Sequence, residues 1–206
     1  MKKQSSFFWT SYSDLMTSLF FVMLVLFILT VGVLVRQVRA TEAELKKIEE
    51  IHQALRNIDD RYFVYNEEHK KHILQIDEIF DTRSANMMDL SENARTLLRD
   101  AGQALVKAMS DLDYEGVSYL IVIEGQASRD NSPINDELSY RRAIALRNFW
   151  FKKPGEQHVD LNKVISNCEI IIAGSGQYGV PREKPDIPPA NQRFLVTIIP
   201  KIGQIN

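Results

Sequence analysis

Cysteine is almost absent from this chain of 206 residues, and the single Cys168 excludes an internal disulfide. Because Cys168 lies in a run of β-forming residues, we expect it to be a small buried apolar side chain. The formal net charge of −2 gives no electrostatic basis for binding nucleic acid. No glycine pattern of a dinucleotide- or phosphate-binding loop is present, and no serine or cysteine stands in a nucleophile-elbow context. The sequence therefore argues against a nucleic-acid binder and a hydrolase, and it predicts no enzyme activity and no cofactor.

Charge is also missing from the N-terminal region, where Asp14 is the only formally charged residue between Phe7 and Val35. The apolar stretch from Leu15 to Val35 would rise about 31 Å as a helix, close to the thickness of a bilayer's hydrocarbon core. The run is too long for a cleaved signal peptide. We therefore expect a short cytoplasmic tail over 1–10 and a transmembrane helix over 11–36.

Asp14 stands out because an ionisable side chain inside a membrane span costs roughly 2.5–3.5 kcal/mol by insertion scales. Ser11 and Ser18 share its helical face, with Thr17 beside them. Such a polar stripe favours a partner interface or a hydrated path for ions. The alternative is that Asp14 only caps the start of the helix.

The next segment, 37–75, is charged and free of proline and glycine, so we expect a helical connector. Apolar residues recur in it with the spacing of a coiled-coil seam. The helix could pair with a second copy of itself, which we favour, or fold back on its own domain. His69 and His72 lie one helical turn apart without a third ligand, so we expect a solvated helix face and no metal. The seam residues are Ile48, Ile51, Leu55, Ile58, Tyr62 and Tyr65.

Helices and strands alternate through the rest of the chain, which predicts a two-layer α/β (α+β) sandwich over 76–206. Helices are expected from Ser91, as N-cap, to about Leu112, at about Asp136–Phe151, and briefly at Leu161–Ile165. Strands are expected at Ile73–Phe80, Tyr119–Glu124, Glu169–Ala173 and Phe194–Ile199.

Two motifs resemble known families. The transmembrane motif of MotB-type stator subunits is similar to the segment Trp9-Thr10-Ser11-Tyr12-Ser13-Asp14-Leu15-Met16-Thr17-Ser18-Leu19. A second resemblance is to the OmpA-like peptidoglycan-binding domain. It runs from Gly125 through Asn135-Asp136-Glu137-Leu138-Ser139-Tyr140-Arg141-Arg142-Ala143 to Asn191-Gln192-Arg193-Phe194. The aromatic lead-in Phe8-Trp9 is most similar to the MotB-like subunit (ZorB) of Zorya anti-phage defence systems. Together the two motifs are found in the order that MotB has.

The first resemblance implies that Asp14 carries H⁺ or Na⁺, with Thr17 and Ser18 as possible residues of the ion path. Burial in a low dielectric favours the neutral form of a carboxyl group, so such a residue could take up and release a proton. The resemblance also implies a MotA-like multi-span partner, five copies around a dimer of this chain, in the bacterial inner membrane. It implies a cytoplasmic N-terminus and a periplasmic C-terminal domain, although the positive charges flanking the span favour the opposite orientation.

The second resemblance implies a peptidoglycan site in which Arg142 binds the free carboxylate of diaminopimelate, with Asn135, Leu138 and Arg193 at other family positions. A guanidinium can hold a carboxylate by two parallel hydrogen bonds. The alternative for Arg142 is a surface salt bridge. The sequence departs from the family's G-x-T-D after the central strand, so either Asp130 supplies the acidic group or that role is lost. We therefore expect a stator subunit that couples ion flow to rotation of its partner and serves anti-phage defence; the alternatives are a flagellar-type motility stator and a passive envelope tether.

Overall fold

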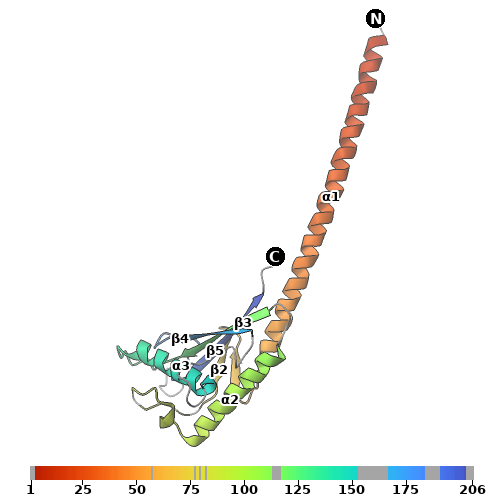
Figure 1. The fold of residues 1–206 in the computed structure, drawn as a ribbon. Coiled ribbons are helices and arrows are strands. Elements are labelled where there is room, and N and C mark those ends of the chain that lie inside the picture. Colours follow the sequence, from red (N-terminus) through yellow and green to blue (C-terminus); the bar gives the residue numbers. More distant parts are fainter. Residues whose placement is uncertain are drawn as a thin grey trace. The chain divides into compact units, whose positions relative to one another are not determined.

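The computed structural model describes residues 3–56, 58–76, 78, 80–81, 83–112, 117–152, 167–183 and 191–202 (Figure 1). The chain divides into two compact units, 1–50 and 51–206.

The first unit is the greater part of the helix α1 (Lys3–Arg56), which contains no proline and one glycine. Its large apolar side chains from Leu15 to Val35 are exposed in the isolated chain. Within the described residues this is the one helix that is long and apolar enough to cross a membrane. The length and composition of α1 therefore fit the span expected over 11–36.

The second unit is a five-stranded sheet with two helices on one face. The strand order is β1-β2-β5-β3-β4, with β3 and β4 parallel and every other neighbouring pair antiparallel. The strands are β1 (Phe63–Asn66), β2 (Lys71–Leu74), β3 (Val117–Gly125), β4 (Cys168–Gly174) and β5 (Phe194–Ile202); the helices are the short 3-10 helix η1 (Met87–Asp89), α2 (Glu92–Asp111) and α3 (Asn135–Phe151).

The two-layer α/β arrangement predicted from the sequence is confirmed, as are two of its three helices and three of its four strands. Ser91 is the N-cap of α2, since its Oγ accepts a hydrogen bond from the backbone N–H of Ala94 at 3.2 Å. Alternate residues of β3, such as Ile121 and Ile123, are buried beneath the helices. Cys168 is half-buried at the edge of this core, and burial raises the pKa of its thiol to about 11. The short helix expected at Leu161–Ile165 lies outside the described residues.

The prediction of a helical connector reaching residue 75 is wrong beyond Arg56, where α1 ends. A turn follows in which the Asp59 carboxylate accepts from the backbone N–H of Arg61 at 3.1 Å, and the chain then enters the hairpin of β1 and β2. The first predicted strand, Ile73–Phe80, is correspondingly displaced to Lys71–Leu74.

The favoured self-pairing of the seam is also wrong for the residues of the second unit. Ile51, Leu55 and Ile58 are buried in the hydrophobic core of the sheet domain itself. These side chains therefore follow the alternative interpretation, in which the helix packs back on its own domain. A spacing of three and four residues marks an apolar face, and it cannot specify which surface covers that face.

His72 does not lie on a solvated helix face, as the sequence suggested, but in strand β2, where it is 2% exposed. Its Nε2 lies 2.8 Å from the carbonyl oxygen of Leu55, and its Nδ1 lies 3.3 Å from that of Val196. His69 is in the hairpin turn, where its backbone N–H donates to Asn66. The two histidines therefore do not form a ligand pair, and the described residues contain no cluster of metal-ligating side chains.

Candidate functional site

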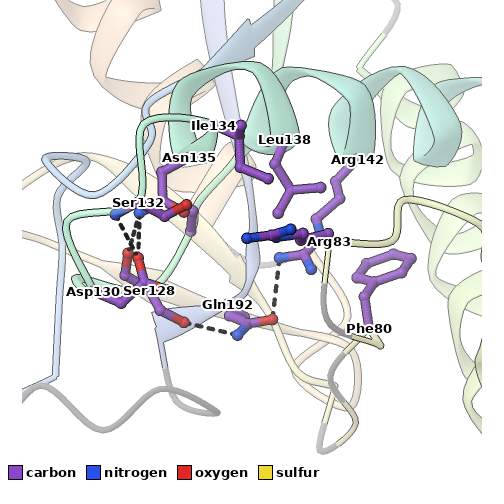
Figure 2. A pocket seen from close by; sticks show the side chains of 11 residues that line it. Phe80, Arg83, Ser128, Asp130, Ser132, Ile134, Asn135, Leu138, Arg142 and Gln192 are labelled. Atoms are coloured by element: carbon purple, nitrogen blue, oxygen red, sulfur yellow. Dashed lines mark hydrogen bonds between the residues drawn. The ribbon is translucent and has the colours of Figure 1, made fainter.

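A cavity of about 380 Å³ lies in the sheet domain where β3 ends and α3 begins (Figure 2). Four of the residues predicted to bind peptidoglycan line it together, namely Asp130, Asn135, Leu138 and Arg142. The remaining walls come from the loop between β3 and α3, from the segment before η1 and from the residue two positions before β5. These other lining residues are Phe80, Arg83, Ala127, Ser128, Ser132, Ile134 and Gln192.

Two glycines allow α3 to lie directly against the ends of the strands. A Cβ on Gly125 would lie 2.2 Å from the carbonyl oxygen of Ser139, and one on Gly174 would lie 2.5 Å from the backbone nitrogen of Tyr140. The Ser139 hydroxyl also accepts a hydrogen bond from the backbone N–H of Gly176 at 2.9 Å. The serine of the N-x-x-L-S-x-x-R-A motif thus anchors the helix, and this anchoring directs Asn135, Leu138 and Arg142 to the cavity.

Arg142 is the most unusual of these residues, because it is 3% exposed. Its Nε donates to the carbonyl oxygen of Ser84 at 2.9 Å, its Nη1 donates to Oε1 of Gln192 at 3.1 Å, and its guanidinium lies 4.8 Å from the centre of the Phe80 ring. No carboxylate of the described residues lies within ion-pairing distance of it. It is therefore not a surface salt bridge, which was the alternative interpretation.

Burial lowers the pKa of Arg142 to about 10, so the side chain remains a cation at neutral pH. A buried charge without a counter-charge is costly, and an anion placed beside it would offset that cost. Gln192 is held in place at the same time, since its Nε2 donates to the Ser128 hydroxyl at 2.7 Å. The guanidinium is thus fixed before any ligand arrives.

An anionic group lines the same cavity. Oδ1 of Asp130 accepts hydrogen bonds from Nδ2 of Asn135 at 2.7 Å and from the backbone N–H of Ser132 at 3.0 Å. The Asn135 bond, followed by the backbone bond, lowers the pKa of this exposed carboxyl below its ordinary value. The cavity therefore combines a buried cation with an exposed anion, and the apolar side chains Ile134, Leu138 and Phe80 stand between or beside them.

Arg193 does not join this cavity, although the sequence placed it among the binding residues. Its guanidinium is 9% exposed and donates to Gln126 at 3.3 Å, to the carbonyl oxygen of Pro181 at 2.7 Å and to Glu183 at 3.3 Å. These contacts tie the loop after β4 to the end of β3. The geometry gives Arg193 a supporting role in the loop structure.

Sequence reasoning missed Phe80, Arg83, Ser128 and Gln192 as lining residues. Gln192 lies between Asn191 and Arg193 in the OmpA-like motif, so its place in that motif could have identified it as a lining residue. Phe80 was expected at the end of a strand and Arg83 lay in no recognised pattern; tertiary folding brings both to the cavity.

The first unit holds the other predicted site. Asp14 lies eleven residues after Lys3, the first helical residue, and the first turn of α1 contains no acidic side chain. The helix cap alternative is therefore wrong for this helix. Thr17 Oγ1 donates to the carbonyl oxygen of Ser13 at 2.8 Å and Ser18 Oγ donates to that of Leu15 at 2.9 Å, so neither hydroxyl donates to Asp14.

No protein-family profile matches the chain, and no curated protein matches it. Among solved structures, the OmpA-like domain of FopA1 from Francisella tularensis is similar at 19% identity, with 70% of this chain and 83% of that chain covered and a TM-score of 0.39. A putative MotB-like protein from Desulfovibrio vulgaris is similar at 14% identity, 76% and 94% coverage and a TM-score of 0.38. The periplasmic domain of Helicobacter pylori MotB (residues 97–256) is similar at 12% identity, 66% and 86% coverage and a TM-score of 0.40. Because these scores and identities are low, we interpret the site from its own residues.

Proposed function

We propose that the sheet domain anchors the chain to peptidoglycan by binding the diaminopimelate-bearing stem peptide in the cavity of Figure 2. The observation that carries this proposal is the buried guanidinium of Arg142, which lacks a carboxylate partner in the described residues and faces the cavity. The free end of diaminopimelate carries a carboxylate and an ammonium group. Arg142 would take the carboxylate and Asp130 the ammonium, and Leu138 would pack against the carbon chain between them.

The experiment is cosedimentation of the detergent-solubilised full chain with purified peptidoglycan sacculi, with free diaminopimelate as competitor. Arg142→Met keeps an apolar stem and removes the charge, and we expect it to weaken binding about 30- to 5,000-fold, since truncating one side of a buried charge pair costs roughly 2–5 kcal/mol. Arg147→Met, on the same helix but outside the cavity, is the matched control. Equal binding by both variants would exclude the proposed site.

For the membrane unit, we propose that Asp14 is the ion-carrying residue of a stator that couples ion flow, with H⁺ as the expected ion, to rotation of a MotA-like partner. A single helix has no walls for an ion path, so five MotA-like subunits around a dimer of this chain would supply them. This proposal is supported by the position of Asp14 several turns inside an apolar helix, and by its match to the MotB-type motif. The topology that follows has a cytoplasmic N-terminus and a periplasmic domain.

The biological setting that we propose for this motor is anti-phage defence of the Zorya type, on the match of the aromatic lead-in Phe8-Trp9. Plaque assays on cells that carry the intact system would test it, and neighbouring helicase or nuclease genes would support it. Flagellar genes beside it would indicate a motility stator instead. Retained biological activity of Asp14→Asn together with loss of activity of Arg142→Met would indicate a passive envelope tether.

A further inference from the structure

A second guanidinium, that of Arg83, lines the same cavity as Arg142 (Figure 2). Arg83 is exposed and belongs to the segment before η1, whereas Arg142 comes from α3. In the described part of the chain, neither side chain is paired with a carboxylate. Two cations that face one cavity repel each other unless an anion lies between or beside them. Asp130 also lines the cavity, but in the proposed function it binds the ligand's ammonium group. A single ligand carboxylate on Arg142 would therefore leave Arg83 without an anionic partner.

The backbone holds Arg83 in this place. Its φ of 62° lies in the left-handed region, which costs a residue with a side chain about 1 kcal/mol or more. The neighbouring Ser84 is fixed from three directions: its N–H donates to the carbonyl oxygen of Asp81 at 2.9 Å, its carbonyl oxygen accepts from Arg142 Nε, and its hydroxyl accepts from the N–H of Asn86 at 3.0 Å. The segment that presents Arg83 is thus tied directly to Arg142.

Arg83 also forms one wall of an adjacent hollow of about 530 Å³. The lining of this hollow includes Arg141, Asn86 and Asn148, together with Ile144 and Ala145, and it includes no acidic residue. Arg141 is highly exposed and lies 3.6 Å from Glu137, a weak surface contact. The two hollows meet at Arg83, so a ligand longer than one amino acid could extend from the cavity past this side chain.

We propose that Arg83 binds a second free carboxylate of the ligand, one residue along the peptide from the carboxylate that Arg142 holds. This inference rests on the proposed function. In a stem peptide the second carboxylate is the α-carboxylate of the γ-linked D-glutamate that precedes diaminopimelate. Arg142 is then the residue that recognises diaminopimelate itself, and Arg83 distinguishes a stem peptide with a free glutamate carboxylate from one in which that group is amidated.

The test compares three soluble probes by titration calorimetry on the detergent-solubilised full chain. They are free meso-diaminopimelate, the tripeptide L-alanyl-γ-D-glutamyl-meso-diaminopimelate, and the same tripeptide with the glutamate α-carboxylate amidated. Arg83→Asn removes the guanidinium while asparagine tolerates the left-handed backbone. Arg147→Asn is the matched control, because the Nε of Arg147 donates to Oδ1 of the neighbouring Asn148 at 3.0 Å and Arg147 lines neither hollow.

We expect Arg83→Asn to weaken binding of the acidic tripeptide about 5- to 10-fold, in line with a charge-assisted hydrogen bond that is partly exposed to water. Its affinity for diaminopimelate and for the amidated tripeptide should stay within about twofold, so the preference for the acidic form disappears. Arg142→Met should weaken all three probes. Equal effects of Arg83→Asn on all three probes, or no effect on any, overturn the inference while leaving the anchor function intact. Failure of the unaltered chain to bind any probe overturns the anchor function, and this inference with it.

Discussion

The long apolar helix of the first unit and the sheet domain each carry a charge that the described part of the chain does not neutralise, but they hold it in opposite ways. Asp14 stands on an exposed helical surface, and the hydroxyls of Thr17 and Ser18 donate to backbone carbonyls of their own helix. Arg142 is buried and is fixed by a carbonyl oxygen, an amide oxygen and an aromatic ring.

This difference matches two different tasks. A side chain that is fixed before binding loses little freedom when a ligand arrives, so Arg142 is suited to holding one partner for a long time. The ion-carrying role proposed for Asp14 requires a side chain that can change partners, and neither the Thr17 nor the Ser18 hydroxyl donates to its carboxylate. In the proposed function, a ligand carboxylate faces Arg142 and a second polypeptide faces Asp14.

The strongest test of this comparison is Asp14→Asn, which keeps the shape of the side chain and removes its ionisation. We expect complete loss of phage protection, or of motility if the chain serves a flagellum, because Asp14 is the only formally charged residue between Phe7 and Val35. Plaque counts or swarm diameters measure the effect. Binding to sacculi should remain unchanged, since the cavity belongs to the other unit.

Asp14→Glu provides the matched control, because it retains the carboxyl group and moves it by one methylene. Partial activity of this variant would show that ionisation is required at this position. Full activity of Asp14→Asn would instead show that the charge of Asp14 is not needed, unlike that proposed for Arg142. The helix α1 would then serve only as an anchor.

A second test concerns the end of α1 that belongs to the sheet domain. Leu55→Ala removes a side chain that is 4% exposed in the core, and we expect it to lower the free energy of unfolding of this domain by about 2–4 kcal/mol. Denaturant unfolding followed by Trp150 fluorescence in a Trp9→Phe background measures this change. A loss of self-association without a loss of stability would revive the coiled-coil interpretation of the seam.

That seam illustrates what the sequence could and could not predict about the fold. The spacing of Ile51, Leu55 and Ile58 identified an apolar face correctly, and the cap at Ser91 and the buried strand around Ile121 were also correct. Local patterns fix such features, because they depend on neighbours within a few residues. Which surface covers an apolar face depends on the whole domain, so the hairpin after Arg56 and the burial of His72 were missed.

The candidate site divides in the same way. Asn135, Leu138 and Arg142 come from one helix, whose period brings them to one cavity, and a single motif was therefore enough to group them. Phe80 and Arg83 reach the cavity through tertiary folding. Arg193 was assigned to the site by its place in the motif, but its guanidinium contacts Gln126 and Glu183 and does not line the cavity.

A smaller effect is expected for Asp130→Asn, which tests whether the exposed anion of the cavity contributes to binding. This variant should weaken binding of free diaminopimelate about 3- to 10-fold, since an exposed charge pair contributes about 1 kcal/mol. The same titration with a ligand whose amino group is acetylated should show no difference between the variant and the unaltered chain. An equal loss with both ligands would mean that Asp130 only shapes the loop through Asn135 and Ser132.

The smallest expected effect is a pH dependence that comes from His72. Burial lowers the pKa of its imidazole, although the carbonyl oxygens of Leu55 and Val196 oppose this shift. The unfolded chain, with an ordinary histidine pKa of about 6.5, then binds the proton more strongly than the folded chain. The stability of the sheet domain should therefore be full above this value and should decrease as the pH is lowered from about 7.5 to 5.5.

Hydrogen exchange of the β2 and β5 backbone amides at several pH values, corrected for the intrinsic exchange rate, measures this slope. His72→Gln retains a donor for the Leu55 carbonyl and does not titrate, so the slope should disappear in that variant. Carboxyl groups with a lowered pKa, such as those of Asp130 and Glu78, stay ionised throughout this range and do not contribute. The opposite slope of stability against pH is equally informative. A domain that gains stability on acidification would contain a His72 imidazolium that donates to the carbonyl oxygens of both Leu55 and Val196, because a neutral ring can donate from only one nitrogen. The imidazolium of His72, beside the C-terminal end of α1, would then be a second buried cation of the sheet domain, besides the guanidinium of Arg142.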